Sequence, residues 1–295
     1  MIPRPGLLVA GVALAGPVSA QEPARPQPVI LGFPSSVQAA GLAGAGVALP
    51  GYAGAIFVNP AGIAPIRVLS IEGGFSVNPD RSTYAMAAGA TRLGSFNVGF
   101  GGRYLRFPSS VPTLDNLSWA GALVYRRGGI ALGSGAKYVS VEDRAGTITR
   151  SLTSDLALQV AFFDIAAVAI SGRNLGEARI SGDGLDLPQT LSMGFSFNLL
   201  DTYSNGRLML TLESTWAERD RRRTVVGLEG GAVFYGLGVV ARAGSGPQPG
   251  VAGNLLSNTT IGGSVLLGRA RLDYAYQHRS VIGRNVHLFG GRWTP

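Results

Sequence analysis

The chain has 295 residues, no cysteine, two histidines, 44 glycines and a formal net charge of +8. This composition excludes disulfides and cysteine- or histidine-rich metal sites, and we expect neither a metal nor a cofactor. Only 14% of the residues are charged while the mean hydropathy is +0.24, whereas soluble domains carry about 25% charged residues. Beyond the N-terminus, no apolar run reaches the roughly 18 residues that a membrane-spanning helix needs.

The positive charge is dispersed. Most basic residues are single arginines between apolar or small residues, not tracts with interleaved aromatic side chains. Nucleic-acid binding needs a concentrated basic surface that neutralises several phosphates together. We therefore expect no nucleic-acid partner.

The first twenty residues have the pattern of a signal peptide. Arg4 supplies a positive charge, Leu7 to Ala15 form an apolar stretch, and Val18-Ser19-Ala20 is a small-residue cleavage site. A transmembrane anchor is the weaker interpretation, because the apolar stretch is too short to span a bilayer. We predict export, with cleavage near Ala20.

Two segments separate the signal peptide from the region of strands. Residues 21–34 are rich in proline and predict a flexible periplasmic leader. Residues 35–66 begin with small residues, typical of a short helix or compact coil, and then reach Asn59-Pro60-Ala61-Gly62, a strong turn signal. We interpret this motif as fixing the segment in place; an ordinary turn between helix and strand is the alternative.

From residue 67 to residue 295, large apolar residues alternate with small or polar ones. Phe195 and Phe197, for example, alternate with Gly194 and Ser196. Such alternation predicts strands with two unlike faces. The polar face is mostly Gly, Ala and Ser, which suits a confined lumen better than the surface of a soluble sandwich. We predict strands over 67–78, 82–93, 94–107, 116–127, 129–142, 150–163, 164–173, 188–200, 205–217, 222–232, 234–244, 257–267, 269–279 and 284–292.

The links between these strands alternate in length. Most links after even-numbered strands are tight, such as Gly128-Gly129, and most links after odd-numbered strands are longer and more polar, such as 174–188. The link 199–205 is somewhat long for its position. Outer-membrane barrels have short periplasmic turns and longer external loops. The sequence therefore predicts an all-β fold: a transmembrane antiparallel barrel of about fourteen strands.

Parity places nine charged residues on the predicted inner face. They could line a solute path, but pairing with each other or with the N-terminal segment is favoured, because buried charges need partners. These lumen-facing candidates are Arg103, Lys137, Asp155, Glu213, Glu229, Arg242, Arg269, Arg271 and Asp273.

Other conspicuous side chains are expected outside the lumen. Arg219, Arg221, Arg222 and Arg223 fall in a predicted external loop, either as a solvated cluster or as a contact for lipopolysaccharide. Aromatic residues such as Trp119 and Tyr274 face outward, as in the interfacial girdles of barrels. Parity points His278 outward and His287 inward. Because no Gly-x-Ser-x-Gly elbow occurs, we expect no enzymatic activity.

Several motifs, in order, resemble a known family. They are Ala39-Ala40-Gly41-Leu42-Ala43-Gly44-Ala45-Gly46, Phe57-Val58-Asn59-Pro60-Ala61-Gly62-Ile63-Ala64, Ser154-Asp155-Leu156-Ala157-Leu158, Gly172-Arg173-Asn174-Leu175-Gly176, Leu187-Pro188-Gln189-Thr190-Leu191 and Leu272-Asp273-Tyr274-Ala275-Tyr276. Together they resemble the PorV/PorQ outer-membrane proteins, relatives of the FadL-like long-chain fatty acid transporters. The chain departs from that pattern at Ile63, in lacking acidic residues before Asn59, and in ending on Trp293-Thr294-Pro295.

The resemblance implies a barrel with a small helical or coil hatch, residues 35–66, folded into the lumen. It also implies that the protein lies in the outer membrane and passes or binds hydrophobic small molecules. The alternative is a barrel associated with a type IX secretion system that handles secreted cargo; a third is a purely structural barrel. The expected partners are outer-membrane lipid, lipopolysaccharide, and a hydrophobic ligand or secretion-system proteins. A transporter should have a continuous apolar groove into the lumen, and a secretion barrel should have a plugged lumen and broad external loops.

Overall fold

The computed structural model describes residues 28–295 except 79–80, 109–112, 164, 183, 203–205, 219–221 and 250–254. The predicted signal peptide 1–20 and the first part of the predicted leader, 21–27, therefore lie outside the described residues. No helix in the described ranges is long and apolar enough to cross a membrane.

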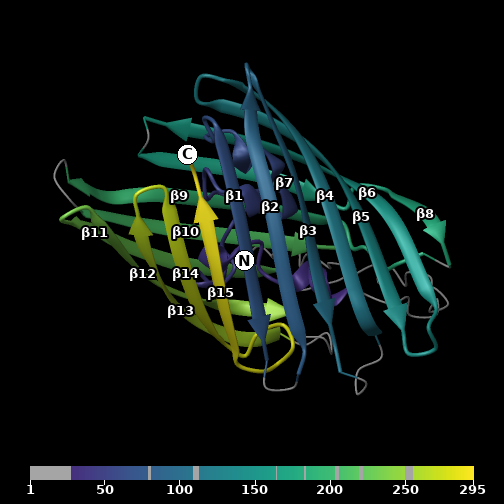
Figure 1. Cartoon of the computed structure of the whole chain (residues 1–295). Helices are drawn as coiled ribbons and strands as arrows, with labels where there is room; N and C mark the ends of the chain where they lie inside the picture. Colours follow the sequence, from purple (N-terminus) through teal and green to yellow (C-terminus); the bar gives the residue numbers. More distant parts are fainter. Residues whose placement is uncertain are drawn as a thin grey trace, which may run out of the picture.

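The described chain is mostly antiparallel β-structure. The strands are β1 (Leu69–Val77), β2 (Thr83–Leu93), β3 (Phe96–Arg106), β4 (Thr113–Arg127), β5 (Ile130–Asp143), β6 (Ile148–Phe162), β7 (Ala166–Arg173), β8 (Glu177–Ser181), β9 (Thr190–Thr202), β10 (Gly206–Ala217), β11 (Arg223–Phe234), β12 (Leu237–Pro249), β13 (Leu255–Leu267), β14 (Ala270–His278) and β15 (Val286–Trp293). All but β8 pair in a ring that β5 and β6 close (Figure 1). The predicted fold, a closed fourteen-stranded barrel, is confirmed.

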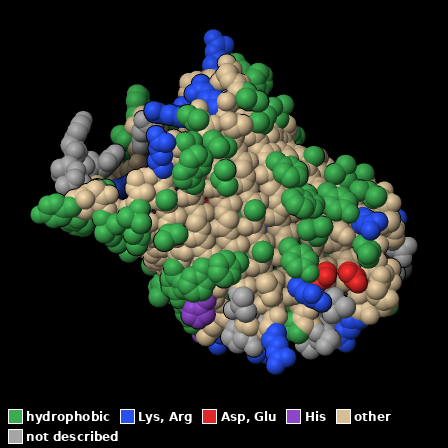
Figure 2. Space-filling view, in the orientation of Figure 1, with side chains coloured by type: hydrophobic (Ala, Val, Ile, Leu, Met, Phe, Trp, Pro, Cys, Tyr) green, Lys and Arg blue, Asp and Glu red, His purple; other side chains and the backbone are tan. Residues whose placement is uncertain are grey.

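Alternation along the strands separates an apolar outside from a small or polar inside. In β6, Leu152 and Leu156 are exposed on the outer face, whereas their neighbours Ser151, Thr153 and Asp155 are buried. Figure 2 shows apolar side chains spread over the outer face of the wall. Burying every second residue against the lumen is the pattern expected of a barrel immersed in an apolar phase.

The two ends of the barrel differ in their connections. Tight turns follow β2, β4, β6, β9, β11 and β13, and this end, which we call the short-turn end, also holds the start of β1 and the finish of β15. Gly94 and Gly128 have positive φ in two of these turns, a conformation that costs glycine little. The link that we expected to be long, 199–205, is shorter, because β9 runs on to Thr202 and β10 starts at Gly206. The opposite end, the loop end, carries the longer connections.

One strand was absent from our prediction. β7 ends at Arg173, and Asn174 then adopts a left-handed conformation with φ 57°. The chain continues as β8, which pairs only with residues 150–153 of β6, the half of that strand nearest the loop end. After β8 the chain turns into the lumen, where Leu185 and Leu187 are buried against β5. The wall is thus interrupted at this one position of the ring, and the interruption is filled from inside.

The N-terminal segment fills the lumen. Residues 28–66, which we call the hatch, contain the 3-10 helices η1 (Val29–Gly32), η2 (Ala53–Phe57) and η3 (Pro60–Ile63) and the short helix α1 (Val37–Ala40). In Figure 1 the hatch is the purple segment inside the ring. Residues 28–34, which we expected in a periplasmic leader, lie inside the barrel: Leu31 packs near the loop end and the Pro34 carbonyl accepts a hydrogen bond from Tyr84.

Candidate functional site

The hatch runs around the lumen and contacts most of the wall. η1 lies against β3 and β4, α1 against β13, β14 and β15, η2 against β1 to β4, and η3 against β3 to β6. Between α1 and η2, the chain passes β9 to β12 through Leu42, Val47 and Ala48. Its apolar side chains, together with those of the inner wall, form the largest buried cluster of the described residues. The interior is therefore a packed core in which the hatch meets nearly every strand.

Inward-facing glycines let the hatch approach the wall closely. A Cβ added at Gly133 would lie 2.5 Å from the Ala61 nitrogen, and one at Gly194 would lie 2.8 Å from the Ala48 nitrogen. Real Cβ contacts are not that short, so these positions have no room for a side chain unless the hatch shifts. We call the inward glycines in contact with the hatch the glycine belt; they are Gly74, Gly99, Gly133, Gly194, Gly227, Gly244, Gly262 and Gly290.

Three wall carboxylates hold the hatch by hydrogen bonds. The Glu213 carboxylate accepts from the backbone nitrogens of Gly46 and Val47 at 2.8 and 3.0 Å. Glu72 accepts from the Gly54 nitrogen at 3.2 Å, and Glu229 accepts from Gln38 Nε2 at 3.0 Å. Hydrogen bonds to a charged acceptor contribute about 1.5–3 kcal/mol each. They also satisfy backbone donors of a segment too irregular to satisfy its own.

Two of these carboxylates, Glu229 and Glu72, pair with arginines on neighbouring strands, and Asp273 joins the same cluster. Arg242 pairs with Glu229 at 2.6 Å and with Asp273 at 3.5 Å, and Arg271 pairs with Asp273 at 2.7 Å. A fourth pair joins Arg292 to Glu72 at 3.5 Å. Arg292 also donates to Gln38 Oε1 at 3.1 Å, so the ion-pair cluster reaches the hatch. Four of the predicted inner-face charges, Glu229, Arg242, Arg271 and Asp273, are brought together here as ion pairs.

A separate buried ion pair lies where the wall is interrupted. Lys137 Nζ is 2.8 Å from Asp155, whose other oxygen accepts from the Asn174 nitrogen at 2.9 Å. Nearby, the Arg103 guanidinium lies 4.5 Å from the Phe57 ring and donates to the Phe33 carbonyl at 3.4 Å. These charges hold the start of β8 and the hatch against the wall, so they do not present a free polar lining.

Of the nine residues predicted to face the lumen, all but one do so. Eight lie on the inner face, but Arg269 is exposed in the turn between β13 and β14 because β14 begins only at Ala270. Sequence reasoning missed Gln38, Glu72 and Arg292, which join the same cluster. Parity with Ser70 and Ser76 could have placed Glu72 inward; nothing in the sequence indicated its bond to Gly54.

The predicted hatch motif lies against the wall of β4 to β6. Asn59 is fully buried, and its amide nitrogen donates to the Val47 carbonyl at 2.5 Å and to Gln159 Oε1 at 3.0 Å. Pro60 and Ala61 follow in η3, where their backbone meets Gly133. Gly62 in turn donates its N–H to the Asn59 carbonyl at 2.9 Å and accepts from Gly51. The motif therefore joins one hatch turn to another and both to β6.

A tyrosine inside the hatch fixes its fold. Tyr52 is fully buried, donates to the Gly46 carbonyl at 2.9 Å and lies 3.1 Å from the Ser35 hydroxyl. Burial raises the pKa of Tyr52 well above its usual range, because the phenolate would lose its hydration. The hydroxyl therefore stays protonated and remains a donor at every physiological pH.

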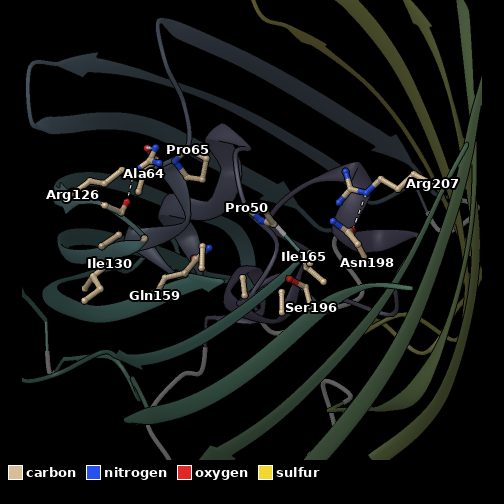
Figure 3. A pocket seen from close by; sticks show the side chains of 16 residues that line it. Pro50, Ala64, Pro65, Arg126, Ile130, Gln159, Ile165, Ser196, Asn198 and Arg207 are labelled. Carbon is tan, nitrogen blue, oxygen red and sulfur yellow. Dashed lines mark hydrogen bonds between the residues drawn. The ribbon is translucent and has the colours of Figure 1, made fainter. Parts of the chain in front are cut away.

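One cavity opens between the hatch and the short-turn end, and we call it the vestibule. It has a volume of about 380 Å³ and lies between the hatch residues Pro50, Ala64 and Pro65 and the ends of β4 to β7, β9 and β10. In Figure 3, Ile130 and Ile165 line it, and two arginines flank it. Arg126 donates to the Ala64 carbonyl at 3.2 Å and Arg207 donates to Asn198 at 3.1 Å (Figure 3). The vestibule thus combines apolar walls with cationic edges.

The remaining candidates lie outside the lumen. His287 was predicted inward but is exposed on the outer face, where its Nδ1 is 2.9 Å from the Tyr274 hydroxyl, because β15 pairs it beside Tyr276. In the predicted lipopolysaccharide loop, residues 219–221 lie outside the described residues, and Arg222 lies over the Trp216 ring. In the described part of the chain, no three His, Asp or Glu side chains gather as metal ligands would.

Comparisons with known proteins show what the chain is similar to. No protein-family model matches it, and no curated protein matches it. Among solved structures, the toluene transporter TbuX of Ralstonia pickettii is 11% identical, with a TM-score of 0.61 over 90% of this chain and 99% of the transporter. The monoaromatic hydrocarbon channel CymD is 12% identical, with a TM-score of 0.65 over 90% and 98%. A FadL homologue of Pseudomonas aeruginosa is 11% identical, with a TM-score of 0.58 over 88% and 98%. At this identity the likeness is one of fold.

Proposed function

We propose that this chain is a non-enzymatic outer-membrane barrel that passes hydrophobic small molecules. The observation that carries the proposal is a closed barrel whose lumen is occupied by its own N-terminal hatch, with a mixed apolar and cationic cavity at one end. Similarity in fold to a toluene transporter and a monoaromatic hydrocarbon channel supports this substrate class. The PorV/PorQ assignment remains a prediction from the sequence motifs.

The architecture also supports a sidedness. Exposed Leu, Ile and Phe side chains cover the outer wall, as a bilayer requires. Short turns and both barrel termini share one end, which is the periplasmic arrangement in outer-membrane barrels. The vestibule then opens toward the periplasm, and the loop end faces the exterior.

Passage requires movement of the hatch, because the described lumen is packed. The wall is held by backbone hydrogen bonds between neighbouring strands around the ring, whereas the hatch consists of four short helical pieces held by side chains and turns. Segments with few hydrogen bonds of their own open at lower free energy than a strand ladder. A hatch shift that opens a path to the vestibule would therefore admit ligand.

An engineered disulfide tests this mechanism. In the double variant Ala48→Cys/Gly194→Cys, the added Cβ at position 194 lies 3.0 Å from the Ala48 Cβ and 2.8 Å from the Ala48 nitrogen. The Cβ atoms of a disulfide are about 3.5–4.5 Å apart, so the hatch must move slightly away from β9 for the bond to form. The chain has no native cysteine to compete. Oxidation should stop the uptake of radiolabelled toluene into vesicles that contain the protein, and reduction should restore it.

The single variants Ala48→Cys and Gly194→Cys, treated with the same oxidant, serve as controls. Uptake that continues unchanged through the oxidised double variant, with the disulfide confirmed by mass spectrometry, would refute passage gated by the hatch.

A second candidate, a barrel that handles secreted cargo, is favoured by one observation: the lumen is plugged. Its other expected feature, broad external loops, is met only in part. The links 144–147 and 279–285 have four and seven residues, and the longer link 182–189 enters the lumen. Co-purification of a secreted protein with the barrel, to the same extent for the wild type and the oxidised double variant, would favour this candidate over small-molecule passage.

A further inference from the structure

Six arginines surround the short-turn end. They lie before β1, at the ends of β2 and β4, at the start of β10 and in the turn between β13 and β14. Arg126 is half-buried and the others are exposed. Among the described residues, none of the six has a carboxylate within ion-pair distance. We call this set the arginine rim: Arg67, Arg92, Arg126, Arg127, Arg207 and Arg269.

Acidic groups do not balance the rim. Glu72 and Asp273, the described acids nearest this end, are buried and already paired with arginines. Asp201 lies opposite Arg207 in the register of β9 and β10. The side chains of Asp164 and Asp201 are outside the described ones, and the six arginines outnumber these two acids. Figure 2 shows blue without red at the upper end of the molecule, whereas blue and red lie together at the opposite end. The loop end indeed contains ion pairs such as Arg106–Asp115.

Bracing of turns explains only part of the rim. Arg92 Nε donates to the Gly94 carbonyl at 2.8 Å, and Arg126 Nε donates to the Gly128 carbonyl at 3.1 Å. The side chains of Arg67, Arg127 and Arg269 donate to no described group. Three exposed cations therefore remain that the fold itself does not use.

Two aromatic residues project from the same end. Phe163 and Tyr235 sit in turns at a φ of 49° each, and both side chains are fully exposed. A bulky residue in the left-handed region is strained, and a glycine would avoid that strain. Their exposure gives no compensating burial in the isolated barrel. Aromatic and arginine side chains together are the residue types enriched where proteins bind one another.

The rim and the vestibule share residues. Arg126 and Arg207 belong to both, so a molecule bound across the rim would cover the mouth of the cavity. A hydrophobic ligand that leaves the vestibule meets water, where exposing its apolar surface is unfavourable by about 25 cal/mol per Å². A soluble acceptor placed over the mouth would remove that cost, and opposite charge would speed its arrival.

We propose that the short-turn end is a docking surface for an acidic soluble protein that takes the ligand from the vestibule. The transfer of a ligand rests on the proposed function, whereas the docking surface is inferred from the charge and exposure of its residues. Long-range attraction between the rim and a carboxylate-rich face would weaken with salt.

The test uses the full barrel in nanodiscs of zwitterionic lipid and a fluorescent decaglutamate peptide as the probe. The rim variant is Arg67→Gln/Arg127→Gln/Arg269→Gln, and the matched control is Arg81→Gln/Arg279→Gln/Arg284→Gln at the loop end. Fluorescence anisotropy at low salt should show binding that the rim variant weakens by about tenfold and that the control leaves within about twofold.

Equal weakening by both variants, or no binding to the wild type, would overturn the proposal. So would rim-dependent binding of phosphatidylglycerol vesicles to the nanodiscs in place of peptide binding, because the rim would then be a site for lipid headgroups. The outcome is separable from the proposed function: the disulfide assay reports passage whether or not the peptide binds, and peptide binding persists whether or not the oxidised barrel passes ligand.

Discussion

At the scale of single residues, the important feature of the inner wall is its glycines, which have no side chain. The glycine belt lets hatch backbone lie where a methyl group would stand. At Gly244, an added Cβ would clash with the Leu42 carbonyl carbon and lie 2.5 Å from the Ala43 nitrogen. Backbone atoms cannot rotate away as a flexible side chain can. A single methyl group at this position is therefore a strong probe of how the hatch is seated.

We expect Gly244→Ala to displace the hatch between Leu42 and Ala48 while leaving the strands intact. Overpacking of this kind costs about 1–3 kcal/mol. The docking of the hatch should be destabilised by that amount, because the strands of the wall are held by their backbone hydrogen bonds. Hydrogen exchange followed by mass spectrometry should show faster exchange in this part of the hatch.

Gly121→Ala is the matched control, because an added Cβ there has no atom within 4 Å. Equal exchange in the two variants would mean that the glycine belt does not constrain the hatch.

At the scale of elements, alternation predicted the barrel strands because each has one face in the core and one outside. The same logic failed for β8, whose five residues are half-buried or exposed without alternation. The course of the hatch was also not predictable. Its pieces are four or five residues long, and bonds such as Gly46 to Glu213 join positions 167 residues apart. No local pattern encodes such pairs.

The break between β7 and β8 can be tested at Asn174. Its side chain donates to the Pro188 carbonyl at 3.0 Å and lies 3.4 Å from Lys137 Nζ. Asn174→Gly keeps the left-handed conformation but loses these bonds, and should cost roughly 1–3 kcal/mol. Asn174→Ala should cost about 1 kcal/mol more because of its positive φ. Urea unfolding in lipid vesicles measures both; a more stable Ala variant would contradict the account.

At the scale of the whole molecule, the strands close the barrel wall, and the hatch blocks the lumen inside it. Deleting residues 28–66 should leave an open lumen lined by Arg103, Lys137, Glu213 and Arg242, all inward and buried in the intact protein. Released from the hatch, these charges would be hydrated, as in water-filled porins. Planar-bilayer recordings should show steady conductance for the deletion variant and almost none for the wild type. A silent deletion variant, with its strand content confirmed by circular dichroism, would mean that the wall collapses without the hatch.

The circular course of the hatch has a consequence for the order of assembly. Gln38 bonds Glu229 and Arg292, which follow it by 191 and 254 residues. Forming contacts this distant requires closing long loops, which slows folding. The earliest part of the chain to emerge therefore cannot reach its final contacts until the last strand has been added. The hatch should become resistant to protease only when β15 has paired with β1. Protection of the hatch therefore reports that the barrel has closed.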